Sequence, residues 1–162
     1  MQIAKSIHVD APVETVWRIL AEEYADVGQW ARAVQSSAPN PDAAPLTGAS
    51  VGGRVCTASI GEVAETIREY DAANYQLAYE AHSKSMPFFV RGLHRRWKLN
   101  PLGGTTEVDL AFEADLMAPF GFLMGWMMRR QFETAINDTL ADLKLYAETG
   151  KIHPDKAKAL AA

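Results

Sequence analysis

Between positions 50 and 115 the chain alternates between apolar and polar residues with a period of two, which is the pattern of half-buried strands. Four groups of turn-forming residues divide this region: "SIG" at 59–61, "DAAN" at 71–74, "KSMP" at 84–87 and "NPLGG" at 100–104. The pattern predicts strands near 50–58, 62–70, 75–83, 89–99 and 105–115. A first strand ending in "SIHV" and another near 33–37 bring the total to about seven. The short connections predict an antiparallel meander.

Apolar residues recur at helical intervals towards both ends of the chain. Val13, Val16, Trp17 and Leu20 share one face of a short helix after the first strand, and a second short helix is expected near 26–32. A longer apolar stripe predicts one helix from about 119 to 149, which Gly150 ends. The last dozen residues are expected to form a loose tail. This order of elements predicts a single α+β domain over 1–150 and a C-terminal tail over 151–162.

Composition and charge argue against several classes of function. The 162 residues carry a formal net charge of −4, so nucleic acid is not an expected partner. The single cysteine, Cys56, excludes an intramolecular disulfide, and the four histidines lack the paired spacing of metal ligands, so no metal or cofactor is expected. The N-terminus lacks the apolar core of a signal peptide, and the most apolar run, at 119–128, is too short to cross a bilayer. We therefore expect a cytoplasmic protein without stable membrane insertion.

The strand predicted at 105–115 indicates which side chains face the core. Its apolar set is Val108, Leu110, Phe112 and Ala114, and acidic residues occupy the other face. Pairing this strand with 89–99 so that Lys98 lies opposite Glu107 also brings Arg96 opposite Asp109. In this register the cations at 94, 96 and 98 point outward, whereas Arg95 points inward.

The same alternation places further polar side chains on the inner face. Glu65 is in phase with the apolar residues of 62–70, and Tyr79 with those of 75–83, so Glu65, Tyr79 and Arg95 can form one lateral row. A buried arginine without a partner is very costly, so the row favours a wet or ligand-filled interior. Two alternatives stay open: an ion pair that only stabilises the fold, and an arginine that extends to the rim.

Four stretches carry a resemblance to a known family: "VDAPVETVW" at 9–17, "VGGRV" at 51–55, "GEVAETIREYDAANYQLAYE" at 61–80 and "RRWKLNPLGGTTEVDL" at 95–110. Through them the chain resembles the START-like helix-grip (SRPBCC) superfamily and, more narrowly, the polyketide cyclase/dehydrase and lipid-transport family of small bacterial proteins. The resemblance covers about residues 2–148. It implies a helix-grip fold, in which a curved antiparallel sheet holds the long C-terminal helix around a deep cavity. Such cavities bind lipids, aromatic polyketides and similar apolar molecules, and in a minority of members they host catalysis.

In a helix-grip fold, the inner face of the sheet and the apolar stripe of the long helix line the cavity. The expected ligand-binding residues are Val63, Glu65, Ile67, Leu77, Tyr79, Leu93, Arg95, Trp97, Leu110, Phe112, Met124, Met128 and Phe132. Most are apolar and a few are polar, as in other small-molecule pockets. Met124 and Met128, near the entrance, are expected to line the cavity, whereas Phe132 is expected to fill the core behind it.

Two functions are compatible with this site. In the first, the protein binds a hydrophobic or amphipathic molecule without transforming it: Arg95 anchors an acidic group, Tyr79 shares the hydrogen bond and Glu65 orients Arg95. In the second, the protein is a polyketide aromatase/cyclase or dehydratase, in which Glu65 or a histidine moves a proton and Arg95 or Tyr79 stabilises an enolate. Binding is favoured, because the sequence contains no visible set of nucleophile, base and orienting group.

Two apolar segments, 84–90 and 116–128, are expected to lie near the entrance to the cavity. They fit a hydrophobic gate, a contact in a homodimer, or a surface that docks transiently on a membrane, and the pattern leaves all three open. A third functional hypothesis, that the protein is an interaction module, rests on the same two segments.

Overall fold

The computed structural model describes the backbone of residues 1–162 and every side chain except those of residues 120–122. The strands are β1 (Gln2–Val9), β2 (Val34–Pro39), β3 (Gly53–Ala58), β4 (Gly61–Asp71), β5 (Gln76–His82), β6 (Val90–Leu102) and β7 (Thr105–Leu116). The helices are α1 (Val13–Trp17), the short turns η1 (Arg18–Glu22) and η2 (Tyr24–Gln29), the long α2 (Phe120–Thr149) and α3 (Pro154–Ala161).

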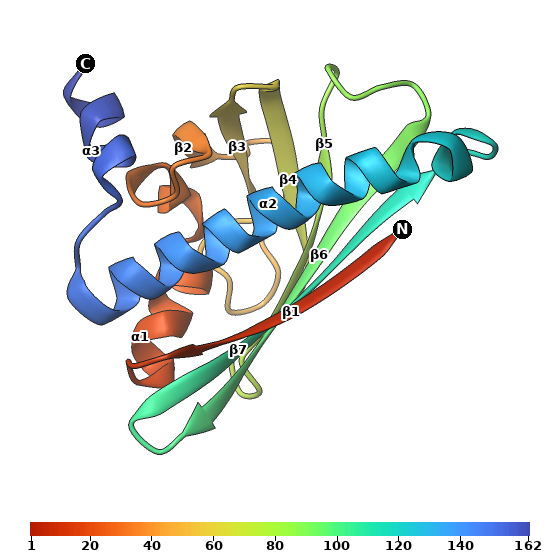
Figure 1. The fold of residues 1–162 in the computed structure, drawn as a ribbon. Coiled ribbons are helices and arrows are strands. Elements are labelled where there is room, and N and C mark those ends of the chain that lie inside the picture. Colours follow the sequence, from red (N-terminus) through yellow and green to blue (C-terminus); the bar gives the residue numbers. More distant parts are fainter.

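All seven strands form one antiparallel sheet in the order β1-β7-β6-β5-β4-β3-β2. The sheet is strongly curved, and α2 lies across its inner face, with α1, η1 and η2 closing one end (Figure 1). Sheet and helix share a core that includes Ile67, Phe112, Ile136 and Leu140. The expected fold class is therefore confirmed: an α+β helix-grip fold with a curved sheet around a long C-terminal helix.

The first helical region is more divided than the sequence pattern predicts. The α-helix ends at Trp17, and the backbone N–H of Glu23 then donates to the carbonyl of Arg18 at 2.8 Å, which closes a wider, π-type turn. Ile19, Leu20 and Ala21 are all buried in this turn. Three consecutive residues cannot all lie on one narrow stripe of a regular α-helix, so the change in helix type follows from packing on several sides.

The pairing of β6 with β7 differs from the predicted register by two residues. Lys98 lies opposite Asp109 rather than Glu107, and Arg96 opposite Ala111 rather than Asp109. The expected five-residue turn is wrong, because both strands continue until only Gly103 and Gly104 connect them, with Gly103 at a φ of 68°. A shift of two residues preserves the alternation of faces. Arg95 accordingly stays on the inner face.

The C-terminal residues are not a loose tail, because they form helix α3. Pro154 occupies the first turn, and Nδ1 of His153 accepts a hydrogen bond from the backbone N–H of Asp155 at 3.2 Å. Lys156 is buried under this helix, and its Nζ donates to the carbonyl of Val34 at 2.5 Å. The helix is thus attached to the first residue of β2.

Candidate functional site

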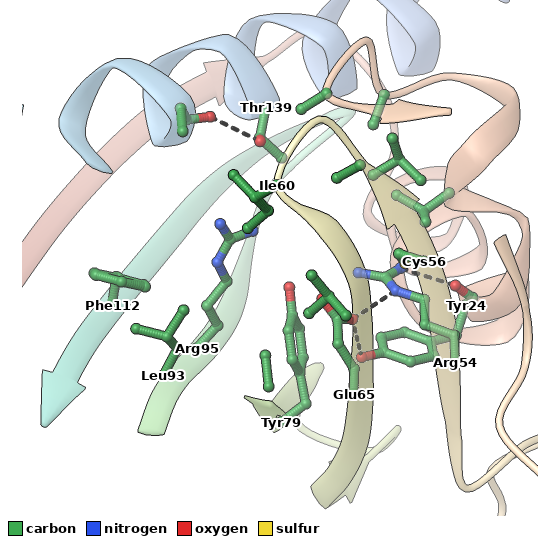
Figure 2. Close-up of a pocket in the computed structure, with 18 of the residues that line it drawn as sticks. Tyr24, Arg54, Cys56, Ile60, Glu65, Tyr79, Leu93, Arg95, Phe112 and Thr139 are labelled. Atoms are coloured by element: carbon green, nitrogen blue, oxygen red, sulfur yellow. Dashed lines mark hydrogen bonds and ion pairs between the residues drawn. The ribbon is translucent and has the colours of Figure 1, made fainter. Parts of the chain in front are cut away.

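A cavity of about 260 Å³ lies between the inner face of the sheet and α2. Strands β3 to β7 supply the largest share of its wall, α2 supplies Phe132, Ala135 and Thr139, and the segment around Trp30 supplies one end. Figure 2 shows side chains converging on this space from the sheet, from the turn that carries Ile60 and from the helix. The period-two alternation of each strand explains why every second residue reaches the cavity.

A buried network holds three of the polar side chains on the wall. Arg54 on β3 lies directly opposite Glu65 on β4, and its Nε donates to Oε2 of Glu65 at 2.6 Å. The hydroxyl of Tyr24 donates to the same oxygen at 2.8 Å, and Arg54 also donates to the backbone carbonyl of Tyr24 at 2.8 Å. The guanidinium of Arg54 lies 4.1 Å from the ring centroid of Tyr24. The charge of Glu65 is therefore compensated locally by Arg54.

The electrostatics of this network keep Arg54 charged and Tyr24 neutral. Burial alone would lower the pKa of Arg54, but Glu65, Tyr24 and Tyr79 act in the opposite direction and leave it well above its ordinary value. Burial raises the pKa of the Tyr24 phenol well above its ordinary value, and the negative charge of Glu65 raises it further. Tyr24 is consequently a hydrogen-bond donor here and a poor candidate for a general base.

Arg95 and Tyr79 form a second polar pair, next to the first one on the inner face of the sheet. They lie directly opposite each other on β6 and β5, and both extend from the sheet toward α2 (Figure 2). The Arg95 guanidinium lies 5.8 Å from the ring centroid of Phe112. Burial tends to lower the pKa of Arg95, but Tyr79 and then Glu65 more than offset this effect, so the pKa is raised and the group stays cationic.

The cavity wall carries an excess of positive charge. Among the described side chains that line it, the cations are Arg54 and Arg95, whereas Glu65 is the single acidic residue. Because Glu65 forms its ion pair with Arg54, Arg95 has no carboxylate of its own. The expectation that Glu65 orients Arg95 is thus wrong: the nearer strand β3 supplies a competing arginine directly opposite Glu65.

The one cysteine also lines the cavity but is poorly suited to nucleophilic chemistry. Burial raises the pKa of the Cys56 thiol to about 11. The thiolate is the reactive form, and it is scarce at neutral pH when the pKa is so high. Cys56 is therefore a small buried wall residue.

Most of the residues expected in the cavity wall do border it: Val63, Glu65, Leu77, Tyr79, Leu93, Arg95, Trp97, Phe112 and Phe132. Phe132 borders the cavity rather than only filling the core behind it. The lateral row is imperfect, because Tyr79 pairs with Ile67 on β4 while Glu65 pairs with Ala81 on β5. Glu65 is therefore displaced along the strand from the row of Tyr79 and Arg95.

Four expected wall residues lie outside the cavity: Ile67, Leu110, Met124 and Met128. Ile67 and Leu110 are almost fully buried in the core. Met124 and Met128 precede Phe132, the first residue of α2 at the cavity, by one to two helical turns. Their position on the helix therefore takes them past its edge.

Arg54, Tyr24 and the segment around Trp30 are among the wall residues that the sequence pattern did not predict. A signal for Arg54 was present in the short turn at 59–61. Counting outward from this turn pairs Ala58 with Gly61 and therefore Arg54 with Glu65. Tyr24 and Trp30 had no such signal, because their approach to the sheet depends on the path of η1 and η2.

The two apolar segments near the entrance lie side by side. The backbone N–H of Met117 donates to the carbonyl of Phe89 at 2.8 Å. Met86 borders the cavity, as does Ile60 on the neighbouring turn, while Phe88, Leu123 and Trp126 are largely exposed. Phe120 and Phe122 fall in the predicted gate segment, but their side chains lie outside the described residues.

Fold and site together define a helix-grip protein with a mostly apolar internal cavity and a small polar group in its wall. A family model described as polyketide cyclase / dehydrase and lipid transport matches residues 1–148, and the chain belongs to this family. The match ends before α3. Across the described residues, no helix combines the length and apolar character needed to cross a membrane.

Solved structures with the same fold have low sequence identity to this chain. The protein XoxI from Bacillus cereus superposes with a TM-score of 0.72 at 14% identity, covering 94% of this chain and 99% of that one. A START superfamily protein from Mycobacterium smegmatis gives 0.65 at 14% identity, with 86% and 93% covered. The di-domain ARO/CYC protein BexL gives 0.71 at 18% identity, covering 89% of this chain and 45% of that one. No curated protein matches the chain in sequence.

Proposed function

We propose that the protein binds a small hydrophobic or amphipathic molecule with an acidic group in the cavity between the sheet and α2. The observation that carries this proposal is the uncompensated Arg95: two cations and one carboxylate line a largely apolar cavity. A charge held in such surroundings is costly unless a partner neutralises it. An acidic ligand would supply that partner.

The proposed roles follow from the geometry of the wall. Arg95 forms a charge-assisted hydrogen bond with the acidic group, and the neighbouring Tyr79 hydroxyl donates a second one. Arg54 forms an ion pair with Glu65, and the Glu65 carboxylate therefore does not compete with the ligand for Arg95. Val63, Leu93 and Phe132 provide apolar contacts for the rest of the molecule.

The test is an affinity comparison between acids and their neutral amides in two matched variants. Naphthoate and decanoate are titrated calorimetrically against wild type, Arg95→Leu and Arg96→Leu, with naphthamide and decanamide as neutral counterparts. Arg96 is the adjacent residue of β6, but it is exposed and forms its ion pair with Glu69 on the outer face. We expect Arg95→Leu to weaken the acids by about tenfold or more, corresponding to ~1.5 kcal/mol for a hydrogen bond to a charged group.

The amides should be affected much less, and Arg96→Leu should behave as wild type toward all four compounds. Equal binding of the acids by wild type and Arg95→Leu would exclude Arg95 as the anchor. Absence of saturable binding by every compound would overturn the proposal of a binding cavity.

A second candidate function is catalysis in the same cavity, as a polyketide aromatase/cyclase or dehydratase. The pairing of Tyr79 with Arg95 favours it, because two adjacent donors can stabilise an enolate oxygen. The family description also includes cyclases and dehydrases. The candidate base Glu65 is, however, engaged by both Arg54 and Tyr24. Recovery of a chemically altered ligand after incubation with the protein would favour this second function over binding alone.

A further inference from the structure

The dimensions of the cavity limit the size of the ligand, which the charge of the cavity wall does not. Along α2 the wall extends from Phe132 to Thr139, which corresponds to about 10 Å at ~1.5 Å per helical residue. The volume is about 260 Å³, whereas a cavity of about 150 Å³ accommodates benzene. Scaling by volume gives space for roughly ten non-hydrogen atoms. This is the size of a one- or two-ring compound, and a long fatty acid has nearly twice as many atoms.

Aromatic ring pairs close the space between sheet and helix on both sides of this stretch. Phe112 and Phe132 are in contact with their ring centroids 4.7 Å apart, at the side nearer the start of α2. Trp30 stacks on Tyr146 at 6.4 Å, one to two turns after Thr139. Ile136 and Leu140 are almost fully buried, so they fix the intervening part of α2 against the core. These ring pairs therefore limit the length of a ligand along the helix.

The composition of the wall favours flat rings over flexible chains. Among the described side chains, six aromatic ones border the cavity: Tyr24, Trp30, Tyr79, Trp97, Phe112 and Phe132. Tyr24 and Tyr79 already meet edge to face, with centroids 5.5 Å apart and an interplanar angle of 69°. A planar ligand can continue such offset and edge-to-face contacts. A flexible chain would lose rotational freedom on entering a cavity of this size and gain no ring contacts.

From these dimensions and contacts we infer that the ligand is a compact aromatic acid of one or two rings, and that the cavity is too small to enclose a long-chain fatty acid. The inference rests on the proposed function, because it takes the acidic group at Arg95 as given. It goes further in assigning the size and shape of the apolar part. It also favours a compact ring compound over the lipids that the family description mentions.

The test compares acids that share a carboxylate but differ in size and shape. Benzoate, naphthoate, decanoate and palmitate are titrated against wild-type protein below the concentrations at which the fatty acids form micelles. We expect naphthoate to bind at least tenfold more tightly than palmitate, with a stoichiometry of one. A variant that fills the cavity, Ala135→Leu, should weaken naphthoate about tenfold or more. The matched control is Ala141→Leu, on an exposed position of the same helix, which should leave the affinity unchanged.

The outcomes distinguish this inference from the proposed function. Tighter binding of palmitate than of naphthoate, weakened by Arg95→Leu, would overturn the size limit and leave the acid-binding function standing. Equal effects of Ala135→Leu and Ala141→Leu would place the naphthoate outside this cavity and overturn the inference. Failure of all four acids to bind would overturn the proposed function itself.

Discussion

At the scale of single residues, the ion pair of Arg54 and Glu65 has the largest expected effect on stability. Arg54→Met would leave the buried Glu65 carboxylate without its cation, and removing one partner of a buried pair costs about 3–5 kcal/mol. Urea denaturation of the variant measures this cost. Arg68→Met is the matched control, because Arg68 pairs with Glu80 on the exposed face, where such a pair contributes little to stability.

The double variant Arg54→Met/Glu65→Met separates two effects on the free energy of unfolding. One is the contribution of the ion pair itself, and the other is the cost of leaving one buried charge without a partner. Replacing both partners by apolar residues of similar volume is often neutral, so most of the lost stability should return. If Arg54→Met destabilised the protein no more than Arg68→Met, Glu65 would have another partner in solution. The statement that Arg95 has no carboxylate partner would then be wrong.

The inward positions of Glu65, Tyr79 and Arg95 follow from the sequence because strand alternation is strict once one face is buried. Their mutual distances do not follow, since these depend on register. Glu65 lies opposite Arg54, and a bulge between Ile67 and Glu69 alters the pairing of β4 with β5 farther along the strand. Sequence alternation thus identifies which side chains enter the cavity, and only the pairing of strands identifies which of them neutralise each other.

At the scale of elements, α3 is expected to be fixed to the body of the protein through Lys156. Lys156→Met removes the hydrogen bond to the partly buried carbonyl of Val34, and α3 thereby loses a contact that holds it to β2. We therefore expect faster subtilisin cleavage in the linker at 150–153 than in wild type. Lys158→Met, on the exposed side of the same helix, should leave the rate unchanged. Equal cleavage rates in all three proteins would show that α3 is held by other contacts.

The elements themselves were predictable to different degrees. Strands β3 to β7 and the long α2 begin and end within about three residues of the expected positions, because periods of two and 3.6 persist over many residues. Helix α3 was missed although Pro154 stands at its first position, a favourable start signal. The division of the first helix into α1, η1 and η2 was not predictable from periodicity, because it depends on burial on several sides at once.

At the scale of the whole molecule, fold and family are established while sequence identity to XoxI, the mycobacterial START protein and BexL stays at 14–18%. The fold is compatible with binding and with catalysis, so the distinction depends on the cavity wall. That wall is assembled from strands far apart in the sequence and from α2 (Figure 2). No single segment contains the site, and global unfolding must therefore abolish binding.

This dependence predicts that an acidic ligand stabilises the entire fold. At a free concentration of one hundred times Kd, a ligand that binds only the native state adds about 2.7 kcal/mol to the free energy of unfolding. For a chain of this size, that corresponds to a rise in Tm of roughly 5–11 °C. The tryptophan fluorescence of buried Trp17, Trp30 and Trp97 can report the transition. Arg95→Leu at the same naphthoate concentration should lose about half of the rise or more, because binding is weakened tenfold or more, whereas Arg96→Leu should retain it. A rise of equal size in Arg95→Leu would mean that the ligand stabilises the protein from a surface other than the cavity wall.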